Sequence, residues 1–448
     1  MIISKSDHLI QILPPKEVDL NTNLQFIIHT IGKAARQAAR TLASCSTDQK
    51  NKALLLMADQ IKTDQKEILD ANLIDVTAAM KGGLNSSMVD RLKLSPESLD
   101  EVAEGIRHVA RLPDPVGRIL REWKRSNKLS FQKVSVPLGV IGMIYESRPN
   151  VTVDAAILCL KAGNACILRG GSEACHSNKA LALSLQRALE ASELPSTSIQ
   201  LIPVTDREAI RILCEMDQYL DCLIPRGGKG LIKTIVEHAR MPVMKHYEGI
   251  CTAYVDKEAN LTMAEQIILN AKCQRPSACN ALETVLLHQK IALEFLKTAG
   301  EKLLQQGAEL RCDPKTLALL PKELQKNFTL QIKKATKEDF QTEFLSLIVA
   351  IKIVDSLEEA IDHIENHGSH HSDLIITEDA NNAEKFLRDI DSATVYWNAS
   401  TRFTDGSEFG FGAEIGISTD KFHARGPVGL EELTSYKYLI RGNGQVRR

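Results

Sequence analysis

Val140-Ile-Gly-Met-Ile-Tyr-Glu-Ser-Arg-Pro-Asn150 begins the stretch that decides the fold. The apolar run at 140–144 has the length and composition of a buried strand. Residues 151–162 then have the pattern of a helix that ends at Gly163, and 165–168 form a second apolar run of strand length. Strand, helix and strand in this order predict a parallel α/β sheet with helices on both faces.

The alternation of strands and helices continues along the chain. Further strands of the first sheet are expected at 199–202, 222–224 and 242–244. After Cys279 a second series begins, with a helix at 357–365 and with strands at 284–287, 347–354, 374–377 and 394–397. Two α/β sheets with Cys279 at their junction predict a cleft between two domains.

Three segments lie outside these two series. Residues 128–136 alternate apolar and polar side chains, and 433–440 have a similar pattern. Each is expected to be a half-exposed strand, either an ordinary edge strand or part of an oligomerisation element. Residues 1–22 contain Pro14-Pro15 and few periodic apolar residues, which predicts a loose N-terminal arm.

The composition argues against several classes of protein. The 448 residues carry a formal net charge of -2 and have a pI near 6.7, which gives no electrostatic basis for binding nucleic acid. Ten cysteines without a CxxC pair indicate neither a disulfide scaffold nor a zinc motif, so reduced thiols and a cytoplasmic location are expected. The first residues contain no continuous apolar segment, and nowhere do eighteen apolar residues run together, so no membrane association is expected.

Asn270-Ala-Lys-Cys-Gln-Arg-Pro-Ser-Ala-Cys-Asn280 contains the candidate nucleophile. Cys279 comes just before the strand expected at 284–287, a position where a thiol can meet substrate while rigid neighbours hold it. Arg275 can stabilise the thiolate, and Cys273 has no comparable position. The alternative is a buried structural thiol, because free cysteine most often behaves as a small core hydrophobe.

Two glycine-rich turns follow strands of the first series. Arg169-Gly170-Gly171-Ser172-Glu173 and Arg226-Gly227-Gly228-Lys229-Gly230 place backbone amides and cationic side chains where helices are expected to begin. Neither is G-x-G-x-x-G, and the second lacks the Lys-Ser/Thr pair of a P-loop. One such turn is more often only a connection, but two on one sheet indicate a dinucleotide site.

The segment around Cys279 closely resembles the gamma-glutamyl phosphate reductases, a family within the aldehyde dehydrogenase superfamily. The resemblance runs from about Phe26 to the C-terminus. Other stretches that carry it are Val136-Pro-Leu-Gly-Val-Ile-Gly-Met-Ile-Tyr-Glu-Ser-Arg-Pro-Asn150 with 151–154, both glycine-rich turns, Asn398-Ala-Ser-Thr-Arg-Phe-Thr-Asp-Gly406, 414–418, 423–427 and 429–437.

The resemblance implies the domain organisation. The expected fold is α/β and aldehyde dehydrogenase-like, with a Rossmann-like cofactor domain, an α/β catalytic domain and a small β oligomerisation element. The NADPH-binding domain is expected at 23–127 and 141–250, and the catalytic domain at 251–415. The oligomerisation hairpin and C-terminal arm are expected at 128–140 and 416–448, which implies a homo-oligomer.

The resemblance also implies a reaction, the NADPH-dependent reduction of L-glutamyl 5-phosphate to L-glutamate 5-semialdehyde in proline biosynthesis. In that reaction the Cys279 thiolate attacks the acyl carbon, phosphate leaves, and hydride transfer to the thioester gives the semialdehyde. The Cys279 amide and Asn150 are the candidate oxyanion hole, where one donor contributes about 2.7 to 4 kcal/mol. Asn280 is a weaker candidate, because it can simply cap the turn.

The remaining site residues follow from the same resemblance. Arg169 suits the 2′-phosphate of NADP(H), and Glu343 resembles the glutamate that holds the nicotinamide ribose, with a solvated carboxylate as its alternative. The cofactor-binding candidates are Arg169, Gly170, Gly171, Ser172, Glu173, Arg226, Gly227, Gly228, Lys229 and Glu343. Guanidinium groups bind phosphate and carboxylate bidentately. At least two of the four arginines Arg148, Arg275, Arg402 and Arg425 are therefore expected to hold substrate. His423 is an alternative.

No metal site is expected. The run of His363, His367, His370 and His371 with Asp373 ends in a Gly-Ser turn and shows no open-site signature. Hydrolytic aldehyde dehydrogenases use a glutamate before a Gly-Gly pair, whereas Met244-Lys-His-Tyr-Glu-Gly-Ile250 has one glycine and a shifted glutamate. A reductase that must protect its thioester from water has reason to lack that base.

Two other functions stay open at this stage. One is a hydrolytic or CoA-acylating aldehyde dehydrogenase, and the other is an inactive nucleotide-binding scaffold. Cys273 departs from the small polar residue usual in the family, which leaves open which thiol is alkylated first. Because no kinase-length extension is present, a glutamate 5-kinase is expected to be a separate protein that forms a transient complex with this chain.

Overall fold

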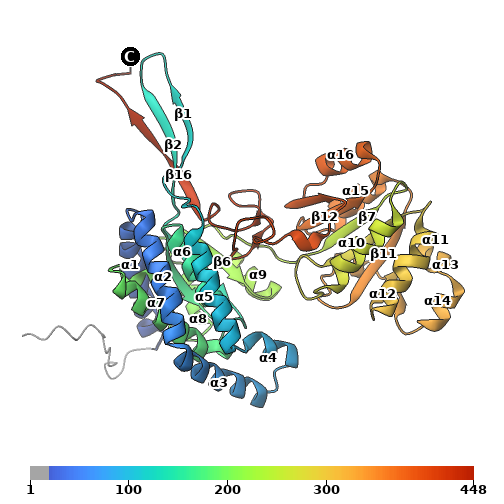
Figure 1. Cartoon of the computed structure of the whole chain (residues 1–448), viewed down its shortest axis with the longest axis horizontal. Coiled ribbons are helices and arrows are strands. Elements are labelled where there is room, and N and C mark those ends of the chain that lie inside the picture. Colours follow the sequence, from blue (N-terminus) through green and yellow to red (C-terminus); the bar gives the residue numbers. More distant parts are fainter. Residues whose placement is uncertain (1–19, 448) are drawn as a thin grey trace, which may run out of the picture.

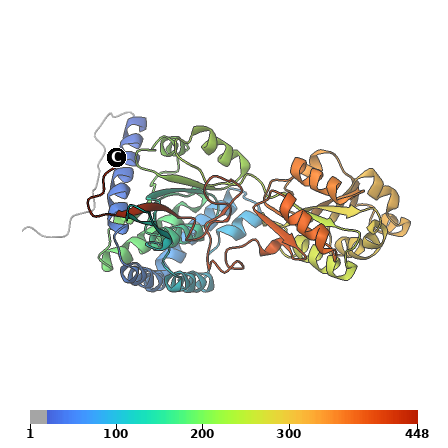
Figure 2. The same cartoon turned by 90° about the horizontal axis from the view of Figure 1, so that it is seen from above.

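The computed structural model describes residues 20–447, which form two α/β bodies and a narrow projecting sheet (Figure 1). Seen from above, the two bodies lie side by side along the long axis of the molecule (Figure 2). Residues 1–19 of the predicted N-terminal arm lie outside the described residues, and its last three residues belong to helix α1 (Leu20–Leu42). No helix in the described part of the chain is long and apolar enough to cross a membrane.

The first body is built on a parallel four-stranded sheet in the order β5-β4-β3-β6. β3 (Val140–Tyr145) and β4 (Ala165–Arg169) are buried along their whole length, because helices cover both faces of their apolar runs. β5 (Ile199–Leu201) pairs with β4, and β6 (Cys222–Arg226) pairs with β3. The strand–helix–strand prediction is confirmed.

One strand predicted for this sheet is wrong. Residues 242–244 make only a single bridge, in which Val243 lies opposite Leu223. Pro242 has no backbone N–H, so it cannot extend the ladder.

Helices surround this sheet, and α1 and α6 (Asn150–Lys161) both pack on β4. Gly163, just beyond α6, has a φ of 75°, the left-handed conformation that ends many helices. The other helices of this body are α2 (Thr47–Thr63), α3 (Gln65–Lys81), α4 (Ser86–Leu92), α5 (Pro96–Arg111), α7 (Cys175–Ala191), α8 (Glu208–Cys214) and α9 (Lys229–His238).

The second body contains a parallel seven-stranded sheet in the order β10-β9-β11-β8-β7-β12-β13. The four predicted strands are confirmed as β8 (Leu282–His288), β11 (Ile348–Val354), β12 (Ser372–Ile376) and β13 (Thr394–Trp397). Three further strands were not expected from the sequence: β7 (Cys251–Val255), β9 (Glu309–Cys312) and β10 (Ile332–Lys334). The longer helices are α10 (Leu261–Cys273), α15 (Leu357–His367) and α16 (Ala380–Asp389), and the shorter ones are α11 (Ala292–Phe295), α12 (Glu301–Gln305), α13 (Pro314–Leu319) and α14 (Lys322–Asn327).

Asp373 gives the second sheet a pH-dependent stability. Its carboxylate is fully buried on β12, where it accepts hydrogen bonds from the Thr252 amide at 2.8 Å and from Ser392 Oγ at 2.5 Å. Burial raises the pKa of Asp373 from 3.8 to about 7. The folded protein therefore keeps a proton that the unfolded chain has already lost, and this group lowers the free energy of unfolding as the pH rises from 3.8 to about 7.

Asp373→Asn should remove this dependence: its Oδ1 can still accept from the Thr252 amide, and its Nδ2 can donate to Ser392 Oγ in place of accepting from it. We expect the free energy of unfolding of the variant, measured with urea relative to the wild type, to increase between about pH 5 and about pH 8. The comparison cancels the other titrating groups, which both proteins share. A difference that stays constant with pH would contradict the assignment.

The projecting sheet has the strand order β1-β2-β16 and is antiparallel. The predicted strands at 128–136 and 433–440 are β2 (Ser130–Pro137) and β16 (Thr434–Arg441), which pair with each other along their full length. β1 (Ile119–Lys124) completes the sheet, and the C-terminal end of the chain lies near its tip (Figure 1). Trp123 stacks on Phe131 with ring centroids 5.2 Å apart.

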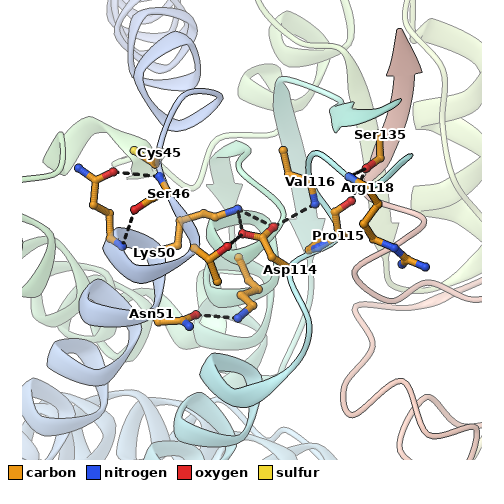
Figure 3. Close-up of polar contacts among 12 residues, drawn as sticks. Cys45, Ser46, Lys50, Asn51, Asp114, Pro115, Val116, Arg118 and Ser135 are labelled. Atoms are coloured by element: carbon orange, nitrogen blue, oxygen red, sulfur yellow. Dashed lines mark hydrogen bonds and ion pairs between the residues drawn. The ribbon is translucent and has the colours of Figure 1, made fainter. Parts of the chain in front are cut away.

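A polar network fastens the base of this sheet to the first body (Figure 3). Lys50 of α2, only 1% exposed, forms an ion pair with Asp114, whose carboxylate also accepts from the Val116 amide at 2.9 Å. The carbonyl of the next residue, Pro115, accepts a hydrogen bond from Ser135 Oγ of β2 at 2.5 Å. The segment between α5 and β1 is therefore held from both sides.

Removing the Asp114 carboxylate should destabilise the protein strongly. Asp114→Ala leaves the buried ammonium of Lys50 without its partner, and breaking a buried pair in this way costs about 3–5 kcal/mol. Asp70→Ala is the matched control, because Asp70 pairs with Lys66 on the exposed surface of α3 and should cost at most about 1 kcal/mol. Urea unfolding of both variants checks the difference, and equal losses would contradict the role of Asp114.

Candidate active site

Cys279 lies between the end of α10 and the start of β8, and its side chain is partly exposed. Its backbone is tightly packed. A Cβ placed on Gly249 would lie 1.9 Å from the Cys279 carbonyl oxygen, so only glycine fits there. The Cys251 thiol contacts the same oxygen, with Sγ 3.4 Å away. The thiol can thus be reached while its main chain is fixed.

Asn280 joins the Cys279 loop to the segment 401–404. Its Nδ2 donates to the Thr404 carbonyl at 2.9 Å, and its own carbonyl accepts from Thr401 Oγ1 at 2.7 Å. On the same side, Arg402 Nε donates to Gln274 Oε1 at 2.9 Å. Asn280 therefore holds the Cys279 loop against the segment 401–404.

Arg148, Arg275 and Arg402 come together near Cys279. Burial, followed by repulsion from Arg226 and other arginines that include Arg275, lowers the pKa of Arg148, and the negative charge of a Cys279 thiolate opposes this shift. Burial and then repulsion from Arg275 lower the pKa of Arg402 in the same way. Positive charge therefore accumulates near Cys279, where it can attract an anionic substrate.

The fourth predicted arginine has another partner. Arg425 forms an ion pair with Asp391 at 2.7 Å and also donates to the Asp391 carbonyl. His423 Nε2 lies 2.8 Å from the Glu432 carbonyl oxygen. Substrate binding by Arg425 or His423 stays a prediction.

Asn150 is the first residue of α6, and its Nδ2 donates to Asp154 Oδ2 at 3.1 Å. Burial raises the pKa of Asp154 to about 6. No contact between Asn150 and Cys279 is recorded in the described part of the chain, so its share in an oxyanion hole also stays a prediction.

Two histidines that the sequence did not single out as site residues face Cys279. One ring nitrogen of His246, one of His371 and the Cys279 sulfur lie within 4.8 Å of one another. The two rings meet edge to face with centroids 5.5 Å apart. Burial, and then the positive charge of Arg226, lowers the pKa of His246, so this imidazole is neutral near pH 7.

Glu343 and Glu248 lie close to this group. Glu343 Oε1 accepts from the Gly249 amide at 3.0 Å, and burial raises the pKa of Glu343. Glu248, the shifted glutamate of the 244–250 segment, instead forms an ion pair with Lys229 at 2.6 Å. The side chain of this segment that faces Cys279 is therefore His246.

A cavity of about 640 Å³ lies at the carboxyl ends of the first sheet. The first glycine-rich turn contributes Arg169, Gly171, Ser172 and Glu173 to its lining, whereas the second contributes Gly230. The opposite wall includes Thr205, Arg207, Arg211, Thr234 and His238. The cavity fits the site that the two turns predict, at the C-terminal ends of parallel strands.

The cations of this cavity differ in their partners. Arg169 donates to the Thr205 carbonyl at 2.7 Å, and Arg211 pairs with Glu208 and Glu215. Arg207 is exposed and has no carboxylate within ion-pair distance anywhere in residues 20–447. Arg207 was missed from the sequence because it stands in an unremarkable loop, and only the fold brings it beside Arg169.

The loop between β3 and α6 connects the cavity with the nucleophile. Glu146 lines the cavity and accepts from the Gly228 amide at 3.1 Å. Ser147 donates to Glu173 Oε1 through its amide and its hydroxyl, and Arg148 then lies in the charged group around Cys279. The loop therefore joins the lining of the cavity to the charged group around Cys279.

Comparison with known proteins agrees with these observations. The model of the aldehyde dehydrogenase family matches residues 25–344. The gamma-glutamyl phosphate reductase of Opitutus terrae is 51% identical over 96% of this chain and 100% of its own, and that of Moorella thermoacetica is 51% identical over 95% and 100%. The crystal structure of the Thermotoga maritima enzyme of that name superposes with a TM-score of 0.90 at 46% identity, covering 94% of this chain and 100% of its own. An acetylating aldehyde dehydrogenase from Geobacillus thermoglucosidasius shares the fold, with a TM-score of 0.67 at 18% identity, covering 96% of this chain and 100% of its own.

Proposed function

The chain belongs to the gamma-glutamyl phosphate reductases of the aldehyde dehydrogenase family, the oxidoreductases that reduce L-glutamyl 5-phosphate in proline biosynthesis, and we propose how its residues perform that reaction. Cys279 attacks the acyl carbon, forms a thioester and releases phosphate. The observation that carries this proposal is the partly exposed sulfur among Arg148, Arg275 and Arg402. Those three guanidinium groups hold the acyl phosphate and the α-carboxylate.

Family membership implies a nicotinamide cofactor, and the cavity fits one. Gly171 and Gly230 line it with bare backbone, and the buried Arg169 Nε has no hydrogen-bond partner within the described residues. We propose NADPH rather than NADH, because Arg207 adds an unpaired cation beside Arg169 that suits a 2′-phosphate. When bound, the cofactor supplies a hydride to the thioester carbon.

The contacts of Glu248 favour a reductase over a hydrolytic enzyme. Its carboxylate is held by Lys229, and the neighbouring Glu343 is hydrogen-bonded to the Gly249 amide. Neither carboxylate is then available to activate water against the thioester. The likeness to an acetylating enzyme at 18% identity concerns the fold alone, so it does not favour a CoA-dependent reaction.

We propose the domain roles given by the sequence, with one boundary corrected, because β1 (Ile119–Lys124) was expected in the cofactor domain and lies in the projecting sheet. Cofactor binding is assigned to 23–118 and 141–250, catalysis to 251–415, and oligomerisation to 119–140 and 416–448. The projecting sheet supports the last assignment, because β1 and β16 each leave one edge without a partner strand in residues 20–447. Its exposed apolar side chains are Ile119, Leu120, Tyr436, Tyr438 and Ile440. A homo-oligomer in the cytoplasm and a transient complex with a glutamate 5-kinase complete this proposal.

Phosphate dependence tests the reaction. In the reverse direction, NADP⁺ reduction by L-glutamate 5-semialdehyde should require inorganic phosphate, because phosphate must release the acyl group from Cys279. The assay compares turnover with and without phosphate, and with arsenate or CoA in its place. Turnover that needs no acyl acceptor would point to a hydrolytic enzyme, and turnover that needs CoA would point to an acylating one.

A further inference from the structure

We propose that His246 is the proton acceptor that activates the Cys279 thiol. This inference rests on the reaction proposed above and adds a residue to it. The starting observation is that a His246 nitrogen, a His371 nitrogen and the Cys279 sulfur lie within 4.8 Å of one another. A thiol must lose its proton before it attacks an acyl carbon, and a neighbouring imidazole is a common acceptor for that proton.

The hydrogen bond on the far side of the ring fixes the state of His246. Its Nδ1 lies 3.0 Å from the Ile417 carbonyl oxygen, which can only accept a hydrogen bond. In the neutral ring Nδ1 therefore carries the proton, and Nε2 keeps a lone pair that can accept one. The ring is also held by its neighbour, since Lys245 forms an ion pair with Asp420 at 2.8 Å and its carbonyl accepts from the Thr419 amide.

Burial distinguishes His246 from His371. His371 is completely buried, its Nδ1 lies 2.8 Å from Ser372 Oγ, and its Nε2 has no hydrogen-bond partner. His246 is only partly buried, so it can exchange its proton with solvent or substrate. We therefore assign His371 the task of supporting the His246 ring through the edge-to-face contact.

The surrounding charges allow this role. Burial, and then the positive charge of Arg226, lowers the pKa of His246, while the Ile417 carbonyl and Glu343 oppose this shift, so the ring is neutral near pH 7. Arg148 and Arg402 both interact electrostatically with Cys279. A neutral imidazole can take the proton of a neighbouring thiol.

The proton and electron pairs balance over the cycle. The proton moves from Cys279 Sγ to His246 Nε2, and the sulfur electron pair forms the bond to the acyl carbon. The carbon–oxygen bond to phosphate breaks, and the leaving phosphate takes that electron pair and the proton from His246. After hydride addition, the carbon–sulfur bond breaks with its electrons on sulfur, and a proton from solvent restores the thiol.

Alkylation of the full-length protein without substrate or cofactor tests the proposal. Iodoacetamide labelling of Cys279, followed by mass spectrometry across the pH range with a chelator present, reports how easily the thiol loses its proton. We expect His246→Asn to slow labelling at pH 7 by about tenfold or more. Above about pH 9.5, where free thiols ionise unaided, the variant and the wild type should converge. Added imidazole should restore part of the rate at pH 7.

The controls separate a chemical role from a structural one. His367→Asn removes a histidine of α15 outside the group and should label at the wild-type rate. His246→Gln serves as the second variant if His246→Asn does not fold. Equal labelling at pH 7, or slower labelling by the same factor at every pH, would overturn the proposal. The proposal would also be overturned if His371→Asn slowed labelling of Cys279 at pH 7 and His246→Asn did not, because His371 would then be the proton acceptor. These outcomes do not depend on the phosphate assay, so the two proposals fail separately.

Discussion

Cys279→Ala is expected to lower turnover by on the order of 10⁴-fold or more, because the covalent intermediate cannot form without the sulfur. The side chain is partly exposed and small, and its sulfur makes no hydrogen bond to any other residue between 20 and 447. The thermal midpoint and the affinity for NADPH should therefore match the wild type. Steady-state kinetics, thermal unfolding and cofactor titration measure the three quantities.

Cys273→Ser is the matched control for this substitution. Cys273 is the last residue of α10, and burial raises the pKa of its thiol. It should react slowly with iodoacetamide, and its loss should leave turnover near the wild-type value. An inactive scaffold would be indifferent to Cys279→Ala, and a protein that depends on Cys273 would reverse the two results.

Gly249→Ala is expected to lower kcat by about 10²-fold, the effect of a misplacement near 1 Å at a reacting group. The added Cβ would lie 1.9 Å from the Cys279 carbonyl oxygen and 2.7 Å from its carbonyl carbon. Both are backbone atoms, so no side-chain rotation relieves the clash. Either the Cys279 loop moves, or the start of β7 moves and disturbs the hydrogen bond from Gly249 to Glu343.

Gly105→Ala provides the comparison. Gly105 lies inside α5, and a Cβ there would meet no atom within 4 Å. Alanine should raise the free energy of unfolding by up to about 1 kcal/mol and leave kcat unchanged. If Gly249→Ala kept the wild-type kcat, the packing of its backbone against Cys279 would not position the nucleophile.

The sheets illustrate what can be predicted from sequence. β3 and β4 are continuous apolar runs, because both faces of a central parallel strand are buried. β9 and β10 were missed because they are short and mix charged with apolar residues, and β10 is an edge strand of the sheet. The strand predicted at 242–244 is the opposite error, a strand expected where only a single bridge forms. These residues are apolar enough for a strand, but Pro242 lacks the backbone N–H that a strand needs for pairing.

For the candidate site, the sequence predicts residues that lie in one continuous segment, but not which side chains from distant segments meet. Cys279 could be predicted because one continuous segment carries both the thiol and its loop. Arg148 and Arg425 look alike in sequence, yet one approaches Cys279 and the other pairs with Asp391. His246 and His371 come from separate segments that meet only in the folded chain. The signal for His246 was its place in the segment where related enzymes carry their base.

The pairing of β2 with β16 also sets an order of events at the ribosome. The whole second body is translated between these two strands, so β2 emerges long before the strand that completes its sheet. Until translation ends, one edge of β2 lacks its cognate neighbour. A surface that needs the β2–β16 pair therefore forms only after the whole second body has been translated.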